Sequence, residues 1–352
     1  MQLGTRDVVV TGAAGWLGTR LVHVLAHGLS DHPALAEAAP DARIRALSLP
    51  GGDASKLQAV SPRVEVVEGD LRSPKDCARL LAGTQNALVF HIAGIIHPRK
   101  VDEFYQINLE GTRNLVRAAQ SAGARRVVVM SSNSPIGVNP RRDHVFDEQS
   151  PYHPYMNYGR SKMLMEMAVR ELREKAATET VLVRAPWFYG PWQPPRQTLF
   201  FTMIRDGKAP IVGDGENRRS MAYLDNLCQG LILAALAPQA DRQVYWIADE
   251  RPYTMNEIVN TVERLLEDEF GQKCAHKRMR LPGFAGDVAQ LADATIQSLG
   301  AYQQQIHVLS EMNKTIACDV SRAKRELGYQ PAVALEEGMR RSIRWCLEQK
   351  LL

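Results

Sequence analysis

Tyr158 and Lys162 stand four residues apart in a segment whose apolar residues recur at helical spacing. On a helix, this spacing places both side chains on one face, about one turn apart. A nearby ammonium group favours the ionised form of a phenol and so lowers its pKa from about 10 toward neutral pH. The pair could therefore act as a general acid and base, although a packed tyrosine beside a solvated lysine would show the same spacing.

Two adjacent serines could supply a hydroxyl group that works with this tyrosine. Ser131 and Ser132 follow the β-branched run 127–130, which predicts a buried strand. Open parallel sheets bind their ligands at the carboxyl ends of the strands. A serine at that edge can hydrogen-bond the oxygen atom whose proton Tyr158 moves.

Three glycines form a second candidate site directly after the predicted strand 7–10, and helical spacing of apolar residues starts just beyond them. Missing Cβ atoms at a strand-to-helix turn let a pyrophosphate approach the backbone N–H groups at the positive helix end. The pattern predicts a dinucleotide-binding turn over residues 11–18. The expected contacts there are Gly12, Ala14, Gly15, Trp16, Leu17 and Gly18.

A parallel sheet would bring these candidate sites to one edge. Short β-branched runs alternate with helical patterns through the first half of the chain, and they are apolar on both faces. The predicted fold class is α/β, a doubly wound Rossmann-type parallel sheet. Its expected strands are residues 7–10, 44–47, 64–67, 87–90, 127–130 and 181–183.

Beyond Arg184 the sequence changes to loops punctuated by Pro and Gly. We expect an NAD(P)-binding Rossmann domain over 1–185, to which a strand near 244–248 returns. The remaining parts, 186–243 and 249–352, are expected to form mainly a smaller, interleaved substrate-binding region. Segment 284–309 has weak periodicity and receives no assignment.

Composition and charge exclude several classes of protein. The 352 residues carry 43 Lys and Arg against 39 Asp and Glu, a formal charge of +4 that is too small to indicate a nucleic-acid partner. Five cysteines without a CxxC spacing indicate neither disulfides nor zinc, and we expect no metal site. No apolar run approaches the ~20 residues of a membrane span, so we expect a cytoplasmic protein with no membrane partner.

Motifs in a fixed order extend these local patterns over nearly the whole chain. They occupy residues 11–18, 69–71, 91–94, 108–112, 131–132, 158–162, 184–191, 219–225 and 319–329. With them the chain resembles an extended short-chain dehydrogenase/reductase of the nucleotide-sugar epimerase/dehydratase and 3β-hydroxysteroid dehydrogenase type. The resemblance implies a small-molecule substrate and an NAD or NADP cofactor.

The resemblance also implies a role for each residue of the predicted active site. Tyr158 would transfer the proton, and Lys162 would hold the nicotinamide ribose and tune Tyr158. Ser132 would bind the substrate oxygen, or Ser131 would do so in its place. Asn108 would support the geometry of the active site. Asp70 and Leu71 would border the adenine, and Ala93 and Pro186 would lie along the nicotinamide. The implied cofactor-binding residues outside the glycine turn are Asp70, Leu71, Ala93, Gly94, Asn108, Ser131, Tyr158, Lys162 and Pro186.

Two positions depart from the family pattern where the cofactor and substrate would be selected. Leu49 stands near the position at which an acidic residue selects NAD and an arginine selects NADP. A leucine there specifies neither cofactor. Only Asp53, a few residues further on, favours NAD. Trp187 replaces the asparagine that contacts a nucleotide diphosphate, and with Phe188 it suits an apolar or ring-shaped substrate, unless both are simply core. Arg219 stands where a diphosphate-binding arginine often stands, unless it braces Asp225 or a surface loop.

The predicted activity is NAD(P)-dependent oxidation or epimerisation of a secondary alcohol or its ketone, and a nucleotide sugar is preferred as substrate. A dehydrogenase or reductase of a steroid-like or polyketide-like compound is the alternative, and a catalytically silent NAD(P)-binding regulator is another. Dehydration is disfavoured because Asn133 and Ser134 stand where a dehydratase carries Asp-Glu. The expected substrate contacts are Ser132, Asn133, Trp187, Phe188 and Arg219.

The resemblance also implies a homodimer, which would pair through the helix that carries Tyr158. Met163 and Met167 would then be exposed in the monomer, unless they pack against the sheet.

Overall fold

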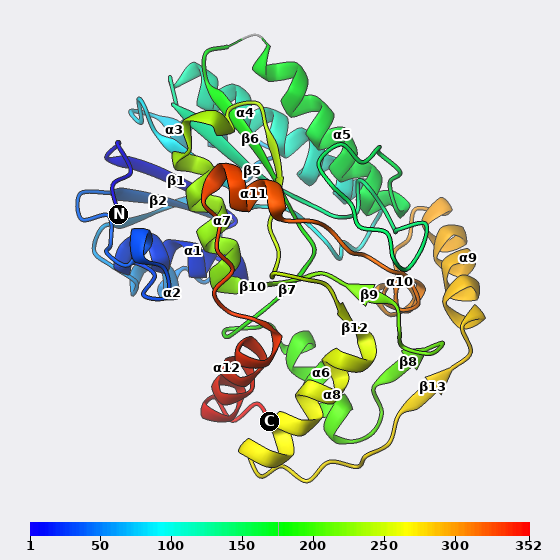
Figure 1. Cartoon of the computed structure of the whole chain (residues 1–352). Coiled ribbons are helices and arrows are strands. Elements are labelled where there is room, and N and C mark those ends of the chain that lie inside the picture. Colours follow the sequence, from blue (N-terminus) through cyan, green and yellow to red (C-terminus); the bar gives the residue numbers. More distant parts are fainter. Residues whose placement is uncertain (175) are drawn as a thin grey trace.

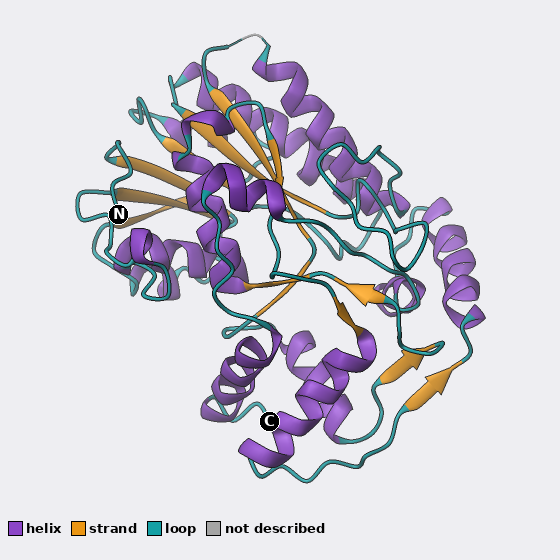
Figure 2. Ribbon diagram, in the orientation of Figure 1, coloured by secondary structure: helices purple, strands orange, loops and turns teal. Residues whose placement is uncertain are grey.

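A seven-stranded parallel sheet forms the centre of the computed structural model, which describes residues 1–174 and 176–352 (Figures 1 and 2). The strand order is β11-β6-β5-β4-β1-β2-β3, and it reverses between β1 and β4, where a doubly wound sheet opens its ligand crevice. The predicted fold class is confirmed, and each predicted strand is present. The strands are β1 (Asp7–Thr11), β2 (Arg43–Ser48), β3 (Val64–Glu68), β4 (Leu88–His91), β5 (Arg126–Ser132), β6 (Glu179–Ala185) and β11 (Val244–Trp246).

Helices cover both faces of this sheet because both faces are apolar (Figure 2). Leu21 and Leu25 of α1 and Leu231 of α7 belong to the apolar cluster on one face. Leu115 of α4 and Met165 of α5 belong to the cluster on the other. The first layer contains α1 (Trp16–His27), α2 (Ser55–Gln58), α7 (Leu224–Leu236) and α11 (Ser321–Leu327), and the second contains α3 (Pro74–Leu81), α4 (Thr112–Ser121) and α5 (Met156–Arg173).

The second lobe surrounds an apolar cluster of its own, to which Phe201, Ile258 and Ile343 contribute. Its helices α6, α8 and α12 lie below the sheet in Figure 1. These elements are α6 (Pro195–Arg205), α8 (Met255–Arg264), the π-helix η4 (Leu265–Glu269) and α12 (Leu335–Glu348). Three short ladders join β7 (Trp187–Tyr189) to β10 (Met221–Tyr223), β9 (Arg218–Arg219) to β12 (Tyr253–Thr254), and β8 (Pro210–Val212) to β13 (Met279–Leu281). Two 3₁₀ turns, η1 (Pro33–Leu35) and η3 (Pro238–Ala240), lie in connections.

The unassigned segment 284–309 forms two helices, α9 (Phe284–Ser298) and most of α10 (Gln304–Glu311), at the right edge of Figure 1. Its periodicity is weak for a physical reason. Outward positions of α9 carry large apolar side chains such as Phe284 and Leu291, which are 67% and 72% exposed. The buried positions instead carry the polar residues Asp293 and Gln297. The usual link between apolar spacing and the buried face is therefore lost.

The two lobes interleave along the chain. Strand β11 pairs with β6 at one edge of the large sheet. Helix α7 also packs on this sheet, although its sequence lies within the stretch expected to form mainly the substrate-binding region.

All five cysteines are free and buried. Within the described residues, no helix has both the length and the apolar character that a membrane crossing requires.

Candidate active site

The glycine turn between β1 and α1 is shaped by close backbone contacts. Gly12 has a φ of 68°, and a Cβ atom there would lie 2.7 Å from the Ala93 nitrogen. A Cβ atom at Gly18 would lie 2.0 Å from the Gly12 carbonyl oxygen. Gly15 caps α1, which has no acidic residue in its first turn, and Ala14 beside it is exposed. The open helix N-terminus and the missing Cβ atoms fit the pyrophosphate of a dinucleotide.

A buried histidine joins this turn to the centre of the sheet. His91 Nδ1 shares a hydrogen bond of 2.7 Å with Thr11 Oγ1, and His91 Nε2 shares one of 2.7 Å with Thr112 Oγ1. Burial lowers the pKa of His91 to about 3, so the ring is neutral at physiological pH. His91 therefore fixes the ends of β1 and β4 rather than carrying a charge.

Asn108 pins the chain beyond β4 to the helix that carries Tyr158. It lies in the π-helix η2 (Phe104–Gly111), a conformation that is frequent at functional sites. Its Oδ1 accepts a hydrogen bond of 2.8 Å from the Ile95 N–H, and its Nδ2 donates one of 3.1 Å to Ser161 Oγ. A Cβ atom on Gly94 would lie 3.3 Å from Lys162 Nζ. The segment at Ala93 and Gly94, which is expected to lie along the nicotinamide, thus contacts Lys162.

Tyr158 is partly exposed on the first turns of α5 and shares a hydrogen bond with the Ser132 side chain. Burial raises the pKa of Tyr158 to about 12. The Ser132 hydrogen bond and the positive charge of Arg196 oppose this shift, whereas the Glu311 carboxylate adds to it. The predicted tyrosine and serine therefore meet, and the surrounding charges act on the phenol in opposite directions.

Lys162 lies one turn further along α5 and is almost fully buried. Its Nζ donates a hydrogen bond of 2.9 Å to the Met130 carbonyl oxygen of β5. Burial lowers the pKa of Lys162 to about 8, and the Glu166 carboxylate opposes this shift. At neutral pH the ammonium group is therefore largely protonated, but it can lose its proton close to the physiological range.

The carboxylate of Glu166 forms the centre of a buried network that sequence reasoning missed. Arg184 Nη2 lies 2.7 Å from Glu166 Oε2, and both side chains are at most 2% exposed. Ser131 donates a hydrogen bond of 2.6 Å to Glu166 Oε1, and Tyr152 donates one of 2.7 Å to Glu166 Oε2. The Ser131 hydroxyl thus donates its proton to Glu166, which favours Ser132 over Ser131 as the group that would bind the substrate oxygen. A charged residue four positions after Lys162 on a buried helix was the available signal.

Two acidic residues at the cofactor edge have partners of their own. The Asp70 carboxylate pairs with Arg72 at 2.5 Å, which holds the pKa of this carboxyl below its ordinary range. Asp53 accepts hydrogen bonds from the Ser55 N–H at 2.9 Å and the Ser55 hydroxyl at 2.5 Å, at the start of α2. Asp53, the only residue that favoured NAD, therefore serves a local turn in this structure.

The aromatic pair at the start of the second lobe packs against other rings. The Phe188 ring lies 5.1 Å from that of Trp16 in the glycine turn, and the Trp187 ring lies 5.6 Å from that of Phe200. Both Trp187 and Phe188 keep partial exposure, and Pro186 before them is buried between β6 and β7. Phe188 thus packs against the glycine turn. Because both rings are partly exposed, each can still contact a substrate.

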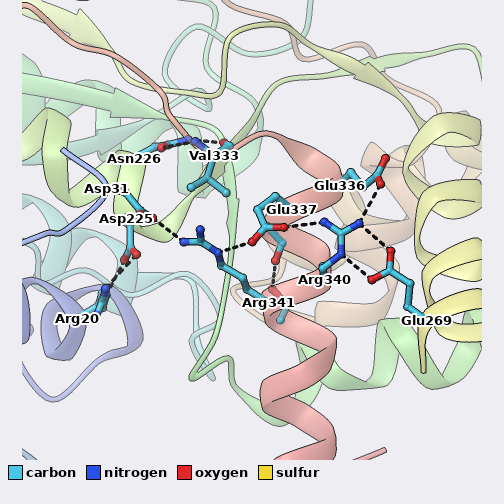
Figure 3. Close-up of polar contacts among 12 residues, drawn as sticks. Arg20, Asp31, Asp225, Asn226, Glu269, Val333, Glu336, Glu337, Arg340 and Arg341 are labelled. Carbon is cyan, nitrogen blue, oxygen red and sulfur yellow. Dashed lines mark hydrogen bonds and ion pairs between the residues drawn. The ribbon is translucent and has the colours of Figure 1, made fainter. Parts of the chain in front are cut away.

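Arg219 does not brace Asp225, which instead forms a two-point ion pair with Arg20 of α1 (Figure 3). Arg219 is 9% exposed and donates a hydrogen bond from Nη2 to the Glu311 carbonyl oxygen. Its Nε finds no partner among the described residues. A buried N–H without an acceptor is costly unless a ligand supplies one.

Asn133, the remaining predicted substrate residue, lies in the turn that follows β5. Its backbone carbonyl oxygen accepts hydrogen bonds from the N–H groups of Ile136 and Gly137.

Besides the predicted Arg219, the region of Tyr158 includes residues that sequence reasoning missed, and three of them, Tyr302, His307 and Glu311, come from α10 and the connection before it. The Tyr302 hydroxyl shares a hydrogen bond of 2.8 Å with His97 Nδ1. We call the group formed by Tyr155, Arg196, Arg219, Tyr302, His307 and Glu311 the substrate wall, because its members interact electrostatically with one another or with Tyr158. Only His307 and Glu311, four residues apart on α10, share a helical spacing, and the fold alone brings in the others.

Comparison with known proteins places this arrangement in a family. The model of the NAD dependent epimerase/dehydratase family matches residues 8–248. The chain belongs to this family. An uncharacterized protein, y4nL, of Sinorhizobium fredii is 53% identical over 97% of this chain and 95% of its own length. A 3beta-hydroxysteroid-dehydrogenase/decarboxylase of Arabidopsis thaliana is 28% identical over 96% of this chain and 79% of its own length.

Solved structures of epimerase/dehydratase enzymes share the fold. The dTDP-glucose 4,6-dehydratase DesIV of Streptomyces venezuelae, solved with NAD and TYD bound, has a TM-score of 0.73 and 26% identity, with 98% of each chain covered. The UDP-glucose 4-epimerase of Thermotoga maritima has a TM-score of 0.75 at 21% identity, with 98% of this chain and 99% of that chain covered. The Rossmann-type sheet of this epimerase/dehydratase family member is thereby confirmed.

Proposed function

We propose that the protein is an NAD(P)-dependent oxidoreductase or epimerase that acts on a secondary alcohol, or its ketone, of a nucleotide sugar. The proposal is supported by Ser132, which acts on Tyr158 from the end of β5, and by Lys162, which lies one turn further along α5 and against Gly94. The family and the NAD in neighbouring structures support it. The cofactor is NAD or NADP, because nothing at the end of β2 selects between them, and a cytoplasmic homodimer remains part of the proposal.

The glycine turn would hold the pyrophosphate, and the chain from Ala93 to Gly94 would line the nicotinamide beside Lys162. When bound, the dinucleotide accepts or returns the hydride. Tyr158 would take the alcohol proton or return it, and Ser132 would hold the substrate oxygen within reach of the phenol. We expect the Lys162 ammonium, one helical turn from Tyr158, to favour the ionised phenol and so oppose the rise in pKa that burial causes.

The substrate wall favours a polar substrate over a steroid-like one. The substrate wall includes the guanidinium group of Arg219, the imidazole of His307 and the carboxyl group of Glu311, and the Arg219 Nε has no partner among the described residues. An apolar substrate would displace water from these groups without replacing its hydrogen bonds, at a cost of about 1–3 kcal/mol for each group. The phosphates and hydroxyls of a nucleotide sugar would pair with them.

A reductase or dehydrogenase of a non-nucleotide compound is the second candidate. Three relatives that span most of the chain support it: two 3β-hydroxysteroid enzymes and a 2-alkyl-3-oxoalkanoate reductase. Trp187 supports it as well, because an indole ring cannot offer the amide that binds a diphosphate.

The first experiment compares the wild-type chain with Tyr158→Phe. Nucleotide released from denatured protein is identified by mass spectrometry, and the affinities for NAD and NADP are then measured. UDP-glucose, UDP-N-acetylglucosamine and dehydroepiandrosterone serve as substrate probes. We expect Tyr158→Phe to lower kcat by about 10²–10⁴-fold without changing dinucleotide affinity. Equal turnover by the variant would favour a silent regulator, and turnover of the steroid alone would favour the second candidate.

A further inference from the structure

Helix α9 presents an apolar stripe to solvent. Phe284, Val288 and Leu291 follow one another at intervals of four and three residues, and each is exposed, Val288 by 61%. Leu299, directly after the helix, continues the stripe eight residues beyond Leu291. At about 100° per residue, these positions fall within an arc of roughly 80° on one side of the helix. An exposed apolar stripe of this kind marks an interaction surface, whereas apolar residues scattered singly do not.

The opposite face of α9 is polar and is fixed to the candidate active site. Asp293 and Gln297 are buried there, and Gln297 donates hydrogen bonds of 2.9 Å to both Asp293 oxygens. The Gln297 Oε1 atom accepts hydrogen bonds from the backbone N–H and the Nδ2 of Asn157, the residue before Tyr158. Asp293 also lies 2.7 Å from His307 Nδ1 of α10. These contacts hold α9 at the outer edge of the molecule with its apolar stripe toward solvent (Figure 1).

A positively charged segment leads into the stripe. Residues 270–286 contain no acidic residue, and their basic residues other than histidine are Lys273, Lys277, Arg278 and Arg280. Lys273, Lys277 and Arg280 are exposed, and none of them forms an ion pair with a described residue. Strand β13 carries Arg280, and only two residues separate this strand from α9. The free positive charges therefore lie next to the start of the apolar stripe.

The charge beside the stripe favours an anionic lipid surface as its partner. Asp287, an exposed acidic residue of α9, is already paired with Lys314 at 2.5 Å. A second copy of the chain, related by a two-fold axis through the stripe, would bring two positive segments together without free acidic groups from α9 to oppose them. An anionic bilayer meets both requirements, because its acyl chains accept the apolar side chains and its phosphate groups attract lysine and arginine.

We propose that the apolar stripe of α9 and the basic segment 273–280, together called the docking face, bind the protein to the surface of an anionic phospholipid bilayer. The side chains of a surface helix enter only the boundary between headgroups and acyl chains, so no helix has to cross the bilayer. The expectation of no membrane partner rested on the lack of a long apolar run, whereas a surface helix needs only one apolar face.

Docking would place the candidate active site beside the lipid surface, because the inner face of α9 contacts Asn157. The inference does not depend on which substrate the site accepts. Its test therefore needs no substrate and no turnover.

Co-sedimentation with lipid vesicles tests the docking face. The full chain is mixed with vesicles of phosphatidylcholine alone, or of phosphatidylcholine and phosphatidylglycerol in equal parts, and the bound fraction is measured at low and high salt. We expect the wild type to partition at least about tenfold more strongly onto the anionic vesicles. High salt should weaken this binding because it screens the exposed charges.

Two double variants separate the apolar contribution from the charged one. We expect Phe284→Glu combined with Leu291→Glu to lower partition onto anionic vesicles by at least about tenfold, because the stripe can no longer enter the lipid. Lys277→Glu combined with Arg280→Glu should lower partition by a similar factor and should remove most of its salt dependence.

Matched controls carry the same kinds of substitution elsewhere on the surface. Leu199→Glu changes an exposed leucine of α6, and Lys75→Glu combined with Arg117→Glu reverses two exposed charges on α3 and α4. We expect each control to lower partition by less than about twofold, because neither touches the docking face. All the substituted side chains are exposed, so urea unfolding should show the same midpoint for every variant as for the wild type.

Three results would overturn the inference. The first is a wild type that does not bind anionic vesicles, and the second is an equal loss of binding in a control. The third is binding that keeps its strength in the Phe284→Glu and Leu291→Glu double variant, since the stripe would then have no part in it. Self-association of the wild type without lipid, if this double variant abolished it, would assign the stripe to a second copy of the chain instead.

Discussion

At the scale of single residues, Lys162 links the charge state of the site to pH. Its pKa is lowered to about 8 because the ammonium is buried, so the positive charge one helical turn from Tyr158 is lost as pH rises through that value. We therefore expect kcat/KM for oxidation of an active probe to fall above about pH 8. A pH profile of kcat/KM checks this, and a flat alkaline limb would show that the ammonium is not required.

Ser131 and Ser132 differ by one position and should differ in function. Ser132→Ala removes a hydrogen bond to Tyr158 and a contact to the substrate oxygen, so we expect kcat to fall by about 10²–10³-fold. Ser131→Ala removes a donor from buried Glu166, so we expect a loss of about 1–3 kcal/mol in the free energy of unfolding with a small effect on kcat. Steady-state kinetics and urea unfolding of both variants measure the two effects, and the reverse assignment would contradict this geometry.

The sequence could predict the candidate catalytic residues because each group lies within a few consecutive residues of the chain. Tyr158 and Lys162 share one helix, and Gly12 and Gly18 share one turn. It could not predict the pair formed by Asp293 and His307, which only the fold brings together.

At the scale of secondary-structure elements, we expect the packing of α1 against the glycine turn to determine dinucleotide affinity. A Cβ atom at Gly18 would meet the Gly12 carbonyl oxygen at 2.0 Å, so Gly18→Ala must displace the turn that faces the pyrophosphate. We expect dinucleotide affinity to fall by about tenfold or more, a loss of ~1.4 kcal/mol or more. Calorimetric titration measures it. Gly283→Ala is the control, because the nearest atom to its Cβ is 3.9 Å away, and an equal loss there would disprove the steric argument.

The contact between α5 and β6 depends on the buried Glu166–Arg184 pair. Glu166→Gln leaves Arg184 buried without its counter-charge, so we expect a loss of about 3–5 kcal/mol in the free energy of unfolding. The pKa of Glu166 is lowered in the folded chain, although burial alone would raise it. Its stabilisation is therefore present above the ordinary glutamate pKa near 4 and disappears as pH falls below it. Urea unfolding at several pH values tests both points, and a stability difference from wild type that persists in acid would contradict this origin.

Elements of the sheet were predictable where burial follows apolar character, as in β1 and β5. Helix α9 was not, because its solvent-facing side carries Phe284 and Leu291, whereas its buried side carries Asp293. A helix that buries polar residues to build a site breaks the rule on which pattern analysis depends.

At the scale of the whole molecule, α12 connects the two lobes through charges that no local pattern reveals. Arg341 pairs with Asp31, in the loop after α1, and Arg340 pairs with Glu269 of η4 (Figure 3). These pairs join positions up to 310 residues apart in sequence. The Rossmann half could therefore be predicted from local periodicity, whereas the placement of the second lobe over the site could not.

The homodimer is the prediction that concerns the whole molecule. Met167 on α5 is 49% exposed, and Met163 on the same helix is partly exposed, as a contact face for a second copy requires. Burial of such side chains stabilises an interface by roughly 25 cal/mol per Å² of apolar area, so Met167→Glu should weaken it strongly. In sedimentation equilibrium at micromolar concentration, we expect the wild type at twice its 39.2 kDa chain mass and the variant nearer to a single chain. Leu299→Glu, directly after α9, where Leu299 is 82% exposed, should leave the mass unchanged. A monomeric wild type would refute the dimer, and a loss of association in Leu299→Glu alone would move the interface to the second lobe.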